Sequence, residues 1–241
     1  MSVPSPPGAL APGAAPCQNA AMASVLITGA NRGIGLALAR RFAGRGDQVI
    51  AICRQTSDAL EKLGVRVESG VDVTSDAAVA ALGAKLAPGS LDLLVLNAGI
   101  LKDDSLNVVS LEDVRWQIEV NAIAPLRVAL ALRKALRPGG KVAAITSRMG
   151  SIGDNGSGGY YGYRMSKAAL NAMAMSLARD LKPAGVAVAI LHPGFVKTDM
   201  TEHEGNLTPD ESAGLLIERI DGLTADNSGT FWHANGQILP W

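Results

Sequence analysis

Residues 24–35 read Ser-Val-Leu-Ile-Thr-Gly-Ala-Asn-Arg-Gly-Ile-Gly, a short apolar run followed by a glycine-rich turn and a helix-like segment. Gly29 permits a tight turn, while Gly33 and Gly35 let the backbone approach a pyrophosphate and let the helix approach the sheet. The first turn of such a helix offers unpaired N–H groups and a partial positive charge. The stretch therefore predicts a strand, a phosphate-binding loop and a helix, with the spacing Gly-x-x-x-Gly-x-Gly.

Short apolar runs alternate with amphipathic segments from this stretch to the end of the chain. The runs expected to form strands are 24–28, 48–53, 65–69, 91–96, 141–146, 186–191 and 229–232, and the helix-like segments are 33–45, 57–63, 75–86, 111–136, 161–181 and 209–221. This alternation predicts right-handed βαβ units. We expect one α/β domain over residues 23–241, a doubly wound parallel sheet of the Rossmann type with about seven strands and helices on both faces.

Residues 1–22 differ from the rest of the chain, because they hold five of its twelve prolines and no charged residue. Such a segment has little to bury, so we expect a disordered Ala/Pro-rich extension that is dispensable for the fold. The alternative is an atypical organelle-targeting leader, although the basic residues of such leaders are absent from it.

Composition narrows the class of protein. The chain has 241 residues, 48% of them hydrophobic, and a formal net charge of zero, so it has no basic field to attract nucleic acid or a membrane surface. No apolar run reaches the roughly 18 residues of a membrane span. Cys17, Cys53 and the three histidines show no metal-ligand spacing. We expect a reduced, cytoplasmic protein without a bound metal.

The residues after the second expected strand favour NADP(H) over NAD(H). A carboxylate about 20 positions beyond the glycine-rich turn would bind the ribose of NAD, but Cys53 and Arg54 stand there and residues 48–57 contain no carboxylate. Arg54 and Arg32 could both face a 2′-phosphate. The alternative is that both arginines are simply solvated.

Two further strand ends carry residues suited to a nucleotide. Asp72, followed by Val73, could accept a hydrogen bond from an adenine amine, or it could cap the helix that follows. Asn97-Ala98-Gly99 allows close backbone approach at the end of the fourth strand, and Asn97 could tie neighbouring strands together. A simple turn is the alternative.

Tyr163 and Lys167 stand four residues apart, which places them one turn apart on the same face of a helix. A cation beside a phenol lowers the pKa of the phenol, which would tune Tyr163 for general acid/base work. Tyr160 and Tyr161 have no lysine at that offset.

Together these motifs resemble the classical short-chain dehydrogenase/reductase family over residues 24–241. The matching features, in the order of the family, are Thr28-Gly-x-x-x-Gly-x-Gly, Asp72, Asn97-Ala-Gly, Asn121, Ser147, Tyr163-x-x-x-Lys167 and Pro193-Gly194. Within the family the chain is most similar to the C-factor-like (C-signal-like) subgroup, on the strength of Cys53-Arg54, Lys197-Thr198-Asp199-Met200 and the ending Pro240-Trp241. The widened interval between Ser147 and Tyr163 departs from the pattern and affects the shape of the pocket.

The resemblance implies a hydride transfer from a nicotinamide to a carbonyl carbon. In this scheme Tyr163 is the general acid/base, and Ser147 hydrogen-bonds the same substrate oxygen. Lys167 lowers the pKa of Tyr163 and holds the nicotinamide ribose, and Asn121 fixes a water near Lys167.

The expected cofactor and substrate sites use the two loops 147–159 and 193–207 as well as these motifs. The cofactor residues are Gly29, Asn31, Arg32, Gly33, Ile34, Gly35, Arg54, Asp72, Val73, Asn97, Ala98, Gly99, Tyr163, Lys167, Pro193, Gly194, Val196 and Thr198. The substrate residues are Ser147, Met149, Ile152, Tyr160 and Phe195, which suit a moderately apolar carbonyl compound.

We therefore expect an NADP(H)-dependent reductase of ketones or aldehydes. The alternatives are a non-catalytic dinucleotide-binding signalling protein of the C-factor type and an NAD-linked alcohol dehydrogenase. Because members of the family pair the helices 111–136 and 161–181 across a two-fold axis, the resemblance also implies a homodimer or homotetramer.

Overall fold

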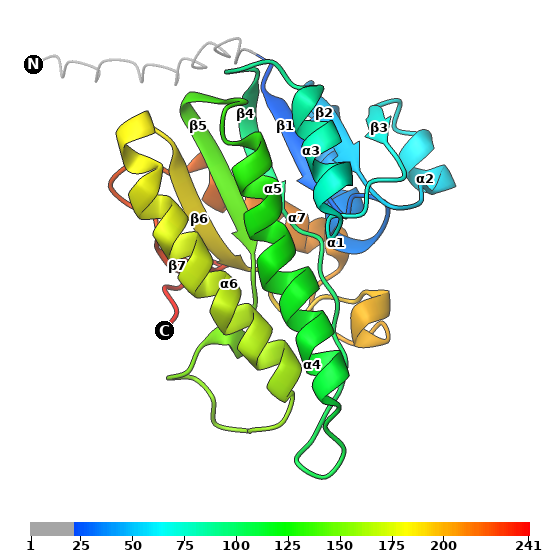
Figure 1. Ribbon diagram of the computed structural model, residues 1–241, viewed down its shortest axis with the longest axis vertical. Helices are drawn as coiled ribbons and strands as arrows, with labels where there is room; N and C mark the ends of the chain where they lie inside the picture. Colours follow the sequence, from blue (N-terminus) through cyan, green and yellow to red (C-terminus); the bar gives the residue numbers. More distant parts are fainter. Residues whose placement is uncertain (1–21) are drawn as a thin grey trace, which may run out of the picture.

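A seven-stranded parallel sheet runs through the centre of the computed structural model, which describes residues 22–241 (Figure 1). Its strands are β1 (Ser24–Thr28), β2 (Gln48–Ile52), β3 (Arg66–Glu68), β4 (Leu91–Leu96), β5 (Leu136–Ile145), β6 (Ala187–His192) and β7 (Phe231–His233). The strand order is β3-β2-β1-β4-β5-β6-β7, and every neighbouring pair is parallel. The predicted doubly wound α/β sheet is confirmed.

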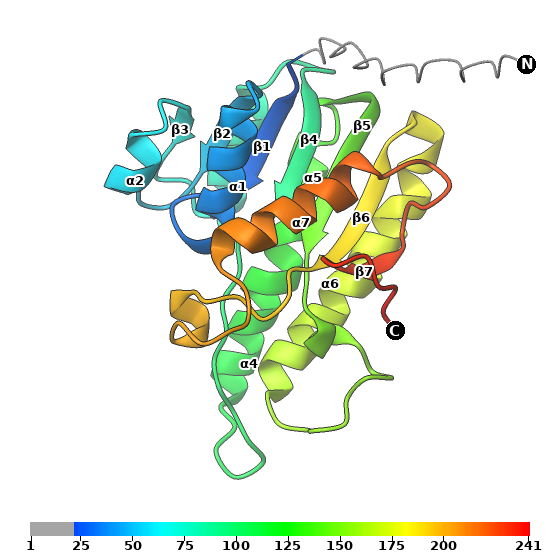
Figure 2. The ribbon, with the colours of Figure 1, turned by 180° about the vertical axis from the view of Figure 1, so that it is seen from behind.

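Helices cover both faces of the sheet. The face seen in Figure 1 carries α3 (Asp76–Ala84), α4 (Leu111–Ile118), α5 (Ala124–Leu132) and α6 (Tyr161–Asp180), and the opposite face in Figure 2 carries α1 (Gly33–Gly44) and α7 (Pro209–Asp221). The helix α2 (Asp58–Glu61) lies near the edge strand β3, and the short turns are η1 (Glu119–Ile123), η2 (Arg148–Gly150), η3 (Lys182–Ala184) and η4 (Asp199–Thr201).

Burial on both faces explains why the strands are apolar throughout. Val25 and Ile27 of β1 belong to the core layer beneath α1 and α7, whereas Leu26 belongs to the layer beneath α5 and α6. Successive side chains of a strand point to opposite faces, so each strand must supply two cores.

One predicted boundary is wrong. The helical segment expected to reach residue 136 ends at Leu132, and β5 begins at Leu136, five residues before the expected strand. Leu136 pairs with Leu91, after which the register shifts before Leu93 pairs with Lys141. The run Pro138-Gly139-Gly140 explains the difference, because proline disfavours a helix immediately before it and the glycines permit an irregular ladder.

The predicted extension covers residues 1–22. Residues 1–21 of it, which include Cys17, lie outside the described residues. Within residues 22–241 no helix is both long and apolar enough to cross a bilayer. The same residues contain no group of three or more His, Cys, Asp or Glu side chains arranged to hold a metal ion.

Candidate active site

The predicted site residues gather at the carboxyl edge of the sheet. The glycine-rich turn, Asn97, Ser147 and Pro193 follow the carboxyl ends of β1, β4, β5 and β6 respectively. In the strand order β2 and β3 lie on one side of β1, and β4 lies on its other side. The direction of winding therefore reverses between β1 and β4, and the crevice of the doubly wound fold lies above these two strands.

The glycine-rich turn forms a close-fitting cradle at the start of α1. Gly29 (φ 67°) and Gly33 (φ 54°) adopt left-handed conformations that favour glycine. A Cβ atom at Gly35 would lie 2.2 Å from the carbonyl oxygen of Gly29 and 2.6 Å from Nδ2 of Asn97. The turn is therefore built from backbone, as a pyrophosphate site at a helix start requires.

Asn97 and Thr28 join the ends of β4 and β1. The hydroxyl oxygen of Thr28 accepts hydrogen bonds from the backbone N–H groups of Asn97 (3.0 Å) and Ala98 (3.1 Å). Nδ2 of Asn97 donates to the carbonyl oxygens of Thr28 (2.9 Å) and Gly29 (3.2 Å). These bonds hold the two sides of the crevice at a fixed separation.

Ser147, Tyr163, Lys167 and Asn121 lie together and are buried. Nζ of Lys167 lies 5.7 Å from the centroid of the Tyr163 ring and donates to the carbonyl oxygen of Ile145 (3.1 Å). The Ser147 hydroxyl lies close enough to the Tyr163 phenol to influence its pKa. A Cβ at Gly99 would lie 3.1 Å from Oδ1 of Asn121 and 3.6 Å from Nζ of Lys167, so the fourth strand ends against this cluster.

The pKa of Tyr163 is opposite to the sequence-based expectation. Burial raises the pKa of its phenol to about 12, and the nearby Ser147 hydroxyl opposes this rise. Burial also lowers the pKa of Lys167 to about 8, which leaves its amine only partly protonated in a slightly basic solution. Spacing alone predicted that the cation would dominate the pKa of Tyr163, whereas desolvation of the buried phenol is the larger effect.

Asn121 lies within η1, a π-helical turn between α4 and α5. Its Oδ1 accepts from the backbone N–H of Ile100 (2.8 Å), and its Nδ2 donates to the Ile100 carbonyl (2.8 Å) and to the Ser166 hydroxyl (2.9 Å). The side-chain amide is thus used to fix the loop after β4 and to contact α6. Single turns of π-helix often occur at functional sites.

The two arginines expected at a 2′-phosphate have different surroundings. Arg54 is exposed at the end of β2, whereas Arg32 forms an ion pair with Asp199 at 2.7 Å. Asp72 accepts two hydrogen bonds from Thr74 through Oδ1, and these bonds lower the pKa of Asp72. Asp72 therefore fixes the turn before α3, whose N-cap is Ser75.

The loop 193–207 reaches the phosphate cradle. A Cβ at Gly33 would lie 3.4 Å from Cγ2 of Thr198, and the Arg32 to Asp199 ion pair joins the same two segments. Val196 is buried and forms a bridge with Leu207, and the hydroxyl of Ser212 donates to the carbonyl of Pro193 (2.8 Å). Sequence reasoning placed Asp199 in a motif but gave no reason to pair it with Arg32.

Of the side chains expected to line the substrate pocket, Met149 is half-buried beside Ser147, and Tyr160 and Phe195 are exposed. Ile152 lines an apolar hollow of about 320 Å³ together with Ala172, Met175 and Trp241, and neither Ser147 nor Tyr163 lines that hollow.

His192 lies at the end of β6, edge-on to His233 at 4.8 Å between ring centroids. Burial is the main cause that lowers the pKa of His192 to about 3.

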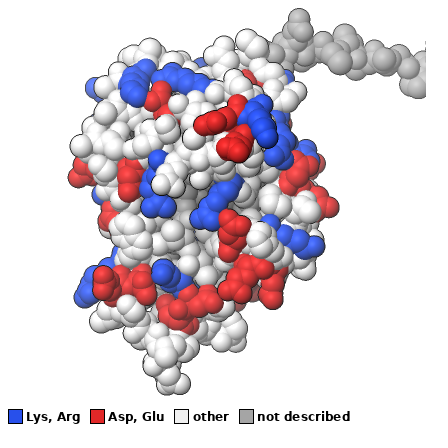
Figure 3. All heavy atoms as spheres, turned by 90° about the vertical axis from the view of Figure 1, so that its right-hand side faces the viewer, with Lys and Arg blue, Asp and Glu red and all other residues white. Residues whose placement is uncertain are grey.

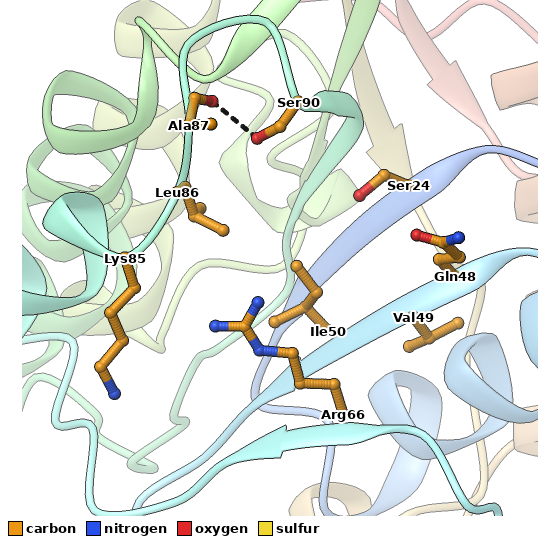
Figure 4. Close-up of a pocket in the computed structure, with 9 residues that line it drawn as sticks. All are labelled: Ser24, Gln48, Val49, Ile50, Arg66, Lys85, Leu86, Ala87 and Ser90. Atoms are coloured by element: carbon orange, nitrogen blue, oxygen red, sulfur yellow. Dashed lines mark hydrogen bonds between the residues drawn. The ribbon is translucent and has the colours of Figure 1, made fainter.

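A second hollow, of about 480 Å³, opens at the amino ends of β1, β2 and β3 (Figure 4). Arg66 and Lys85 line it, and both are paired with Glu68. This hollow lies at the edge of the sheet opposite to Ser147, so it is separate from the candidate active site. Figure 3 shows acidic and basic side chains interspersed over the face of the molecule around β3, which therefore carries no continuous basic surface.

Comparison with known proteins gives consistent matches. The profile of the short chain dehydrogenase family matches residues 23–207. The chain is 42% identical over 226 residues to a 1-hydroxy-2-glutathionyl-2-methyl-3-butene dehydrogenase from Rhodococcus sp. (strain AD45), covering 91% of this chain and 100% of the relative. It is 40% identical over 164 residues to the C-signal protein of Myxococcus xanthus, covering 67% of this chain and 99% of that protein.

Solved structures of similar fold include the carbonyl reductase Sniffer of D. melanogaster, with a TM-score of 0.85 and 32% identity over 91% of this chain and 100% of that one. The NADPH-bound carbonyl reductase from chicken fatty liver has a TM-score of 0.81 and 30% identity, over 91% of this chain and 99% of the other.

Proposed function

The chain belongs to the short chain dehydrogenase family and is an oxidoreductase, and we propose that it reduces a ketone or aldehyde to an alcohol with NADPH. The observation that carries this proposal is the buried group of Ser147, Tyr163 and Lys167 beside a glycine cradle. A purely binding protein would have no use for a buried phenol and amine held together in the crevice.

Tyr163 is suited to donate the proton in the reductive direction. Because its pKa is held at about 12, the phenol carries its proton at neutral pH. The alkoxide that forms when a carbonyl is reduced is a stronger base than a phenolate, so the proton moves to the substrate oxygen. Ser147, within hydrogen-bonding reach of Tyr163, orients the same oxygen and stabilises its developing charge.

The residues at the carboxyl edge of the sheet fit a dinucleotide. The cradle formed by Gly29, Gly33 and Gly35 would hold the pyrophosphate, because a Cβ at Gly35 would collide with backbone. Asp72, the run 97–99 and the loop 193–198 would hold the adenine and nicotinamide ends. When bound, the nicotinamide supplies the hydride.

We assign NADP(H) on the strength of the arginines. Arg54 is exposed just beyond β2, and Arg32 follows the first strand at the cradle. Both guanidinium groups suit a 2′-phosphate. Arg32 would leave its ion pair with Asp199 to bind that phosphate. The similarity to an NADPH-bound carbonyl reductase supports this assignment.

Lys167 and Asn121 would complete the site. Lys167 would hold the ribose hydroxyls next to the nicotinamide. The Asn121 side chain already forms three hydrogen bonds, so its backbone carbonyl is the atom left to fix a water near Lys167.

The substrate is proposed to be a moderately apolar carbonyl compound bounded by Met149, Tyr160 and Phe195. One relative is named for a glutathionyl alcohol, which makes glutathione adducts a reasonable part of a substrate panel. The similarity to C-signal keeps a non-catalytic signalling role as the second candidate. Turnover of ketones, aldehydes, quinones and glutathione adducts separates the two roles.

We propose a homodimer or homotetramer formed through the paired helices α4–α5 and α6. Trp116, Ile123, Leu130 and Met165 expose apolar side chains on these helices, which lie side by side on one face of the sheet (Figure 1). The proposed domain boundary after residue 22 rests on the family match, which begins at residue 23. The proposed cytoplasmic location rests on the sequence prediction alone.

The test is a Tyr163→Phe variant assayed on that panel with NADPH. We expect kcat to fall at least 100-fold, because a positioned general acid contributes roughly 10²–10⁴-fold, while NADPH affinity stays within about two-fold. Tyr161→Phe is the matched control, since Tyr161 is an exposed tyrosine on the same helix, and it should keep full activity. A Tyr163→Phe enzyme with more than a tenth of the normal kcat would refute the proposal.

A further inference from the structure

The first turn of α6, the helix that carries Tyr163 and Lys167, is not capped by its own N-cap residue. Tyr160 occupies that position with a left-handed backbone (φ 52°, ψ 42°) and, among the described residues, forms no side-chain cap bond. By contrast, α4 and α7 are capped by the side chains of Ser110 and Thr208. The first N–H groups of a helix need acceptors, so α6 depends on another part of the chain.

Asp104, in the loop between β4 and α4, provides these acceptors. Its two carboxylate oxygens accept hydrogen bonds from the backbone N–H groups of Tyr161 and Gly162, the second at 2.9 Å. Its own carbonyl accepts from the N–H of Tyr160 at 2.9 Å. One residue thus binds three consecutive N–H groups, and its negative charge faces the positive end of the helix.

The loop that carries Asp104 is itself fixed to the neighbouring helix. Oε1 of the fully buried Gln117 accepts from the N–H of Lys102 (2.9 Å), and Asn121 exchanges two hydrogen bonds with Ile100. Residues 100–104 therefore connect η1 and α4 on one side to the start of α6 on the other.

The contact between α6 and α4 leaves little room for adjustment. A Cβ at Gly162 would lie 2.4 Å from Nε2 of Gln117, 3.1 Å from Cα of Val114 and 3.3 Å from Oδ2 of Asp104. A side chain at this position would displace the Gln117 amide or separate the first turn of α6 from α4.

We propose that Asp104 is a positioning residue for the proton transfer, an inference that rests on the proposed function. The carboxylate binds the backbone of Gly162, and Tyr163 is the next residue. Asp104 acts on the phenol of Tyr163 by fixing the position of the first turn of α6. A displacement of about 1 Å at a reacting group can cost about 100-fold in rate. The loop that carries Asp104 continues from the run 97–99. It therefore connects the residues proposed to contact the cofactor with the start of the helix that carries Tyr163.

Kinetics on the full-length enzyme test the proposal with Asp104→Ala, Asp104→Asn and the control Asp103→Ala, which alters an exposed neighbour. We expect kcat of Asp104→Ala to fall about 10- to 100-fold while KM and the NADPH dissociation constant stay within about three-fold. Asp104→Asn keeps one acceptor oxygen and should recover part of kcat. Equal kcat for Asp104→Ala and the wild type, or an equal loss in Asp103→Ala, would overturn the proposal.

Hydrogen exchange of the peptide 158–167, measured without substrate, gives a second readout. The N–H groups of Tyr161 and Gly162 should exchange at least ten-fold faster in Asp104→Ala and less so in Asp104→Asn. Unchanged protection would overturn the proposal even if activity fell. If the wild type reduces no carbonyl compound, the proposed function fails, and this exchange alone decides whether Asp104 holds the helix. If Asp104→Ala does not fold, Asp104→Asn carries both measurements.

Discussion

Replacing Gly35 by alanine should strongly destabilise the protein, although alanine is the better helix former. The new Cβ would lie 2.2 Å from the Gly29 carbonyl oxygen, and real Cβ contacts essentially never fall under 3.0 Å, so the loop and α1 must separate by at least 0.8 Å. Overpacking of this kind costs roughly 1–3 kcal/mol. The movement also strains the two hydrogen bonds from Asn97, each contributing about 1 kcal/mol.

The higher helix propensity of alanine offsets about 1 kcal/mol of this cost. We therefore expect the free energy of unfolding to fall by about 3 kcal/mol in Gly35→Ala. The matched control is Gly44→Ala in the same helix, where a Cβ would meet no atom within 4 Å. That variant should gain up to about 1 kcal/mol. Urea unfolding followed by tryptophan fluorescence measures both values, and NADPH titration should show at least a ten-fold weaker affinity for Gly35→Ala alone. If the two variants proved equally stable, the cradle would not be rigid and the reasoning would fail.

The remaining predictions concern pH, cofactor choice and assembly. The pKa of His192 is lowered to about 3 in the folded protein, so as the pH drops below about 6.5 this imidazole takes up a proton in the unfolded chain but not in the folded one. The free energy of unfolding should therefore fall, by up to about 1.4 kcal/mol per pH unit. His192→Asn should make the melting temperature depend less on pH between pH 6.5 and 5, and an unchanged dependence would contradict this. Arg54→Ala should weaken NADPH binding at least ten-fold and NADH binding less than two-fold by fluorescence titration, whereas equal weakening would remove the 2′-phosphate assignment. Trp116→Glu should shift the sedimentation mass to that of a monomer, and an unchanged mass would exclude α4 from the interface.

Local patterns in the sequence were sufficient for the fold. The apolar runs and the turn after Thr28 depend on residues within a few positions of one another, and the structure places strands at each of them. Where a boundary failed, at β5, the ladder pairing of Leu136 with Leu91 overrode a helical pattern that continued up to Pro138.

The candidate site was only partly predictable, because much of it depends on contacts between distant residues. The motifs identified Ser147, Tyr163 and Lys167, and all three are buried together. The pKa of Tyr163 depends on burial, which spacing does not reveal. Asp104 binds residues 57 and 58 positions away, and Arg32 pairs with Asp199 at a separation of 167, so no local signal could have found either contact.

The π-helical turn at Glu119–Ile123 holds one residue more than a turn of α-helix does. The extra residue is taken up as a local bulge, so its loss would restore a regular α-helix and would leave the helical faces before and after the turn in place. Gln117 would keep the loop it binds, and Val128 and Leu132 would keep their places in the core. A deletion here would instead act on the backbone around Asn121, whose side chain binds the loop after β4.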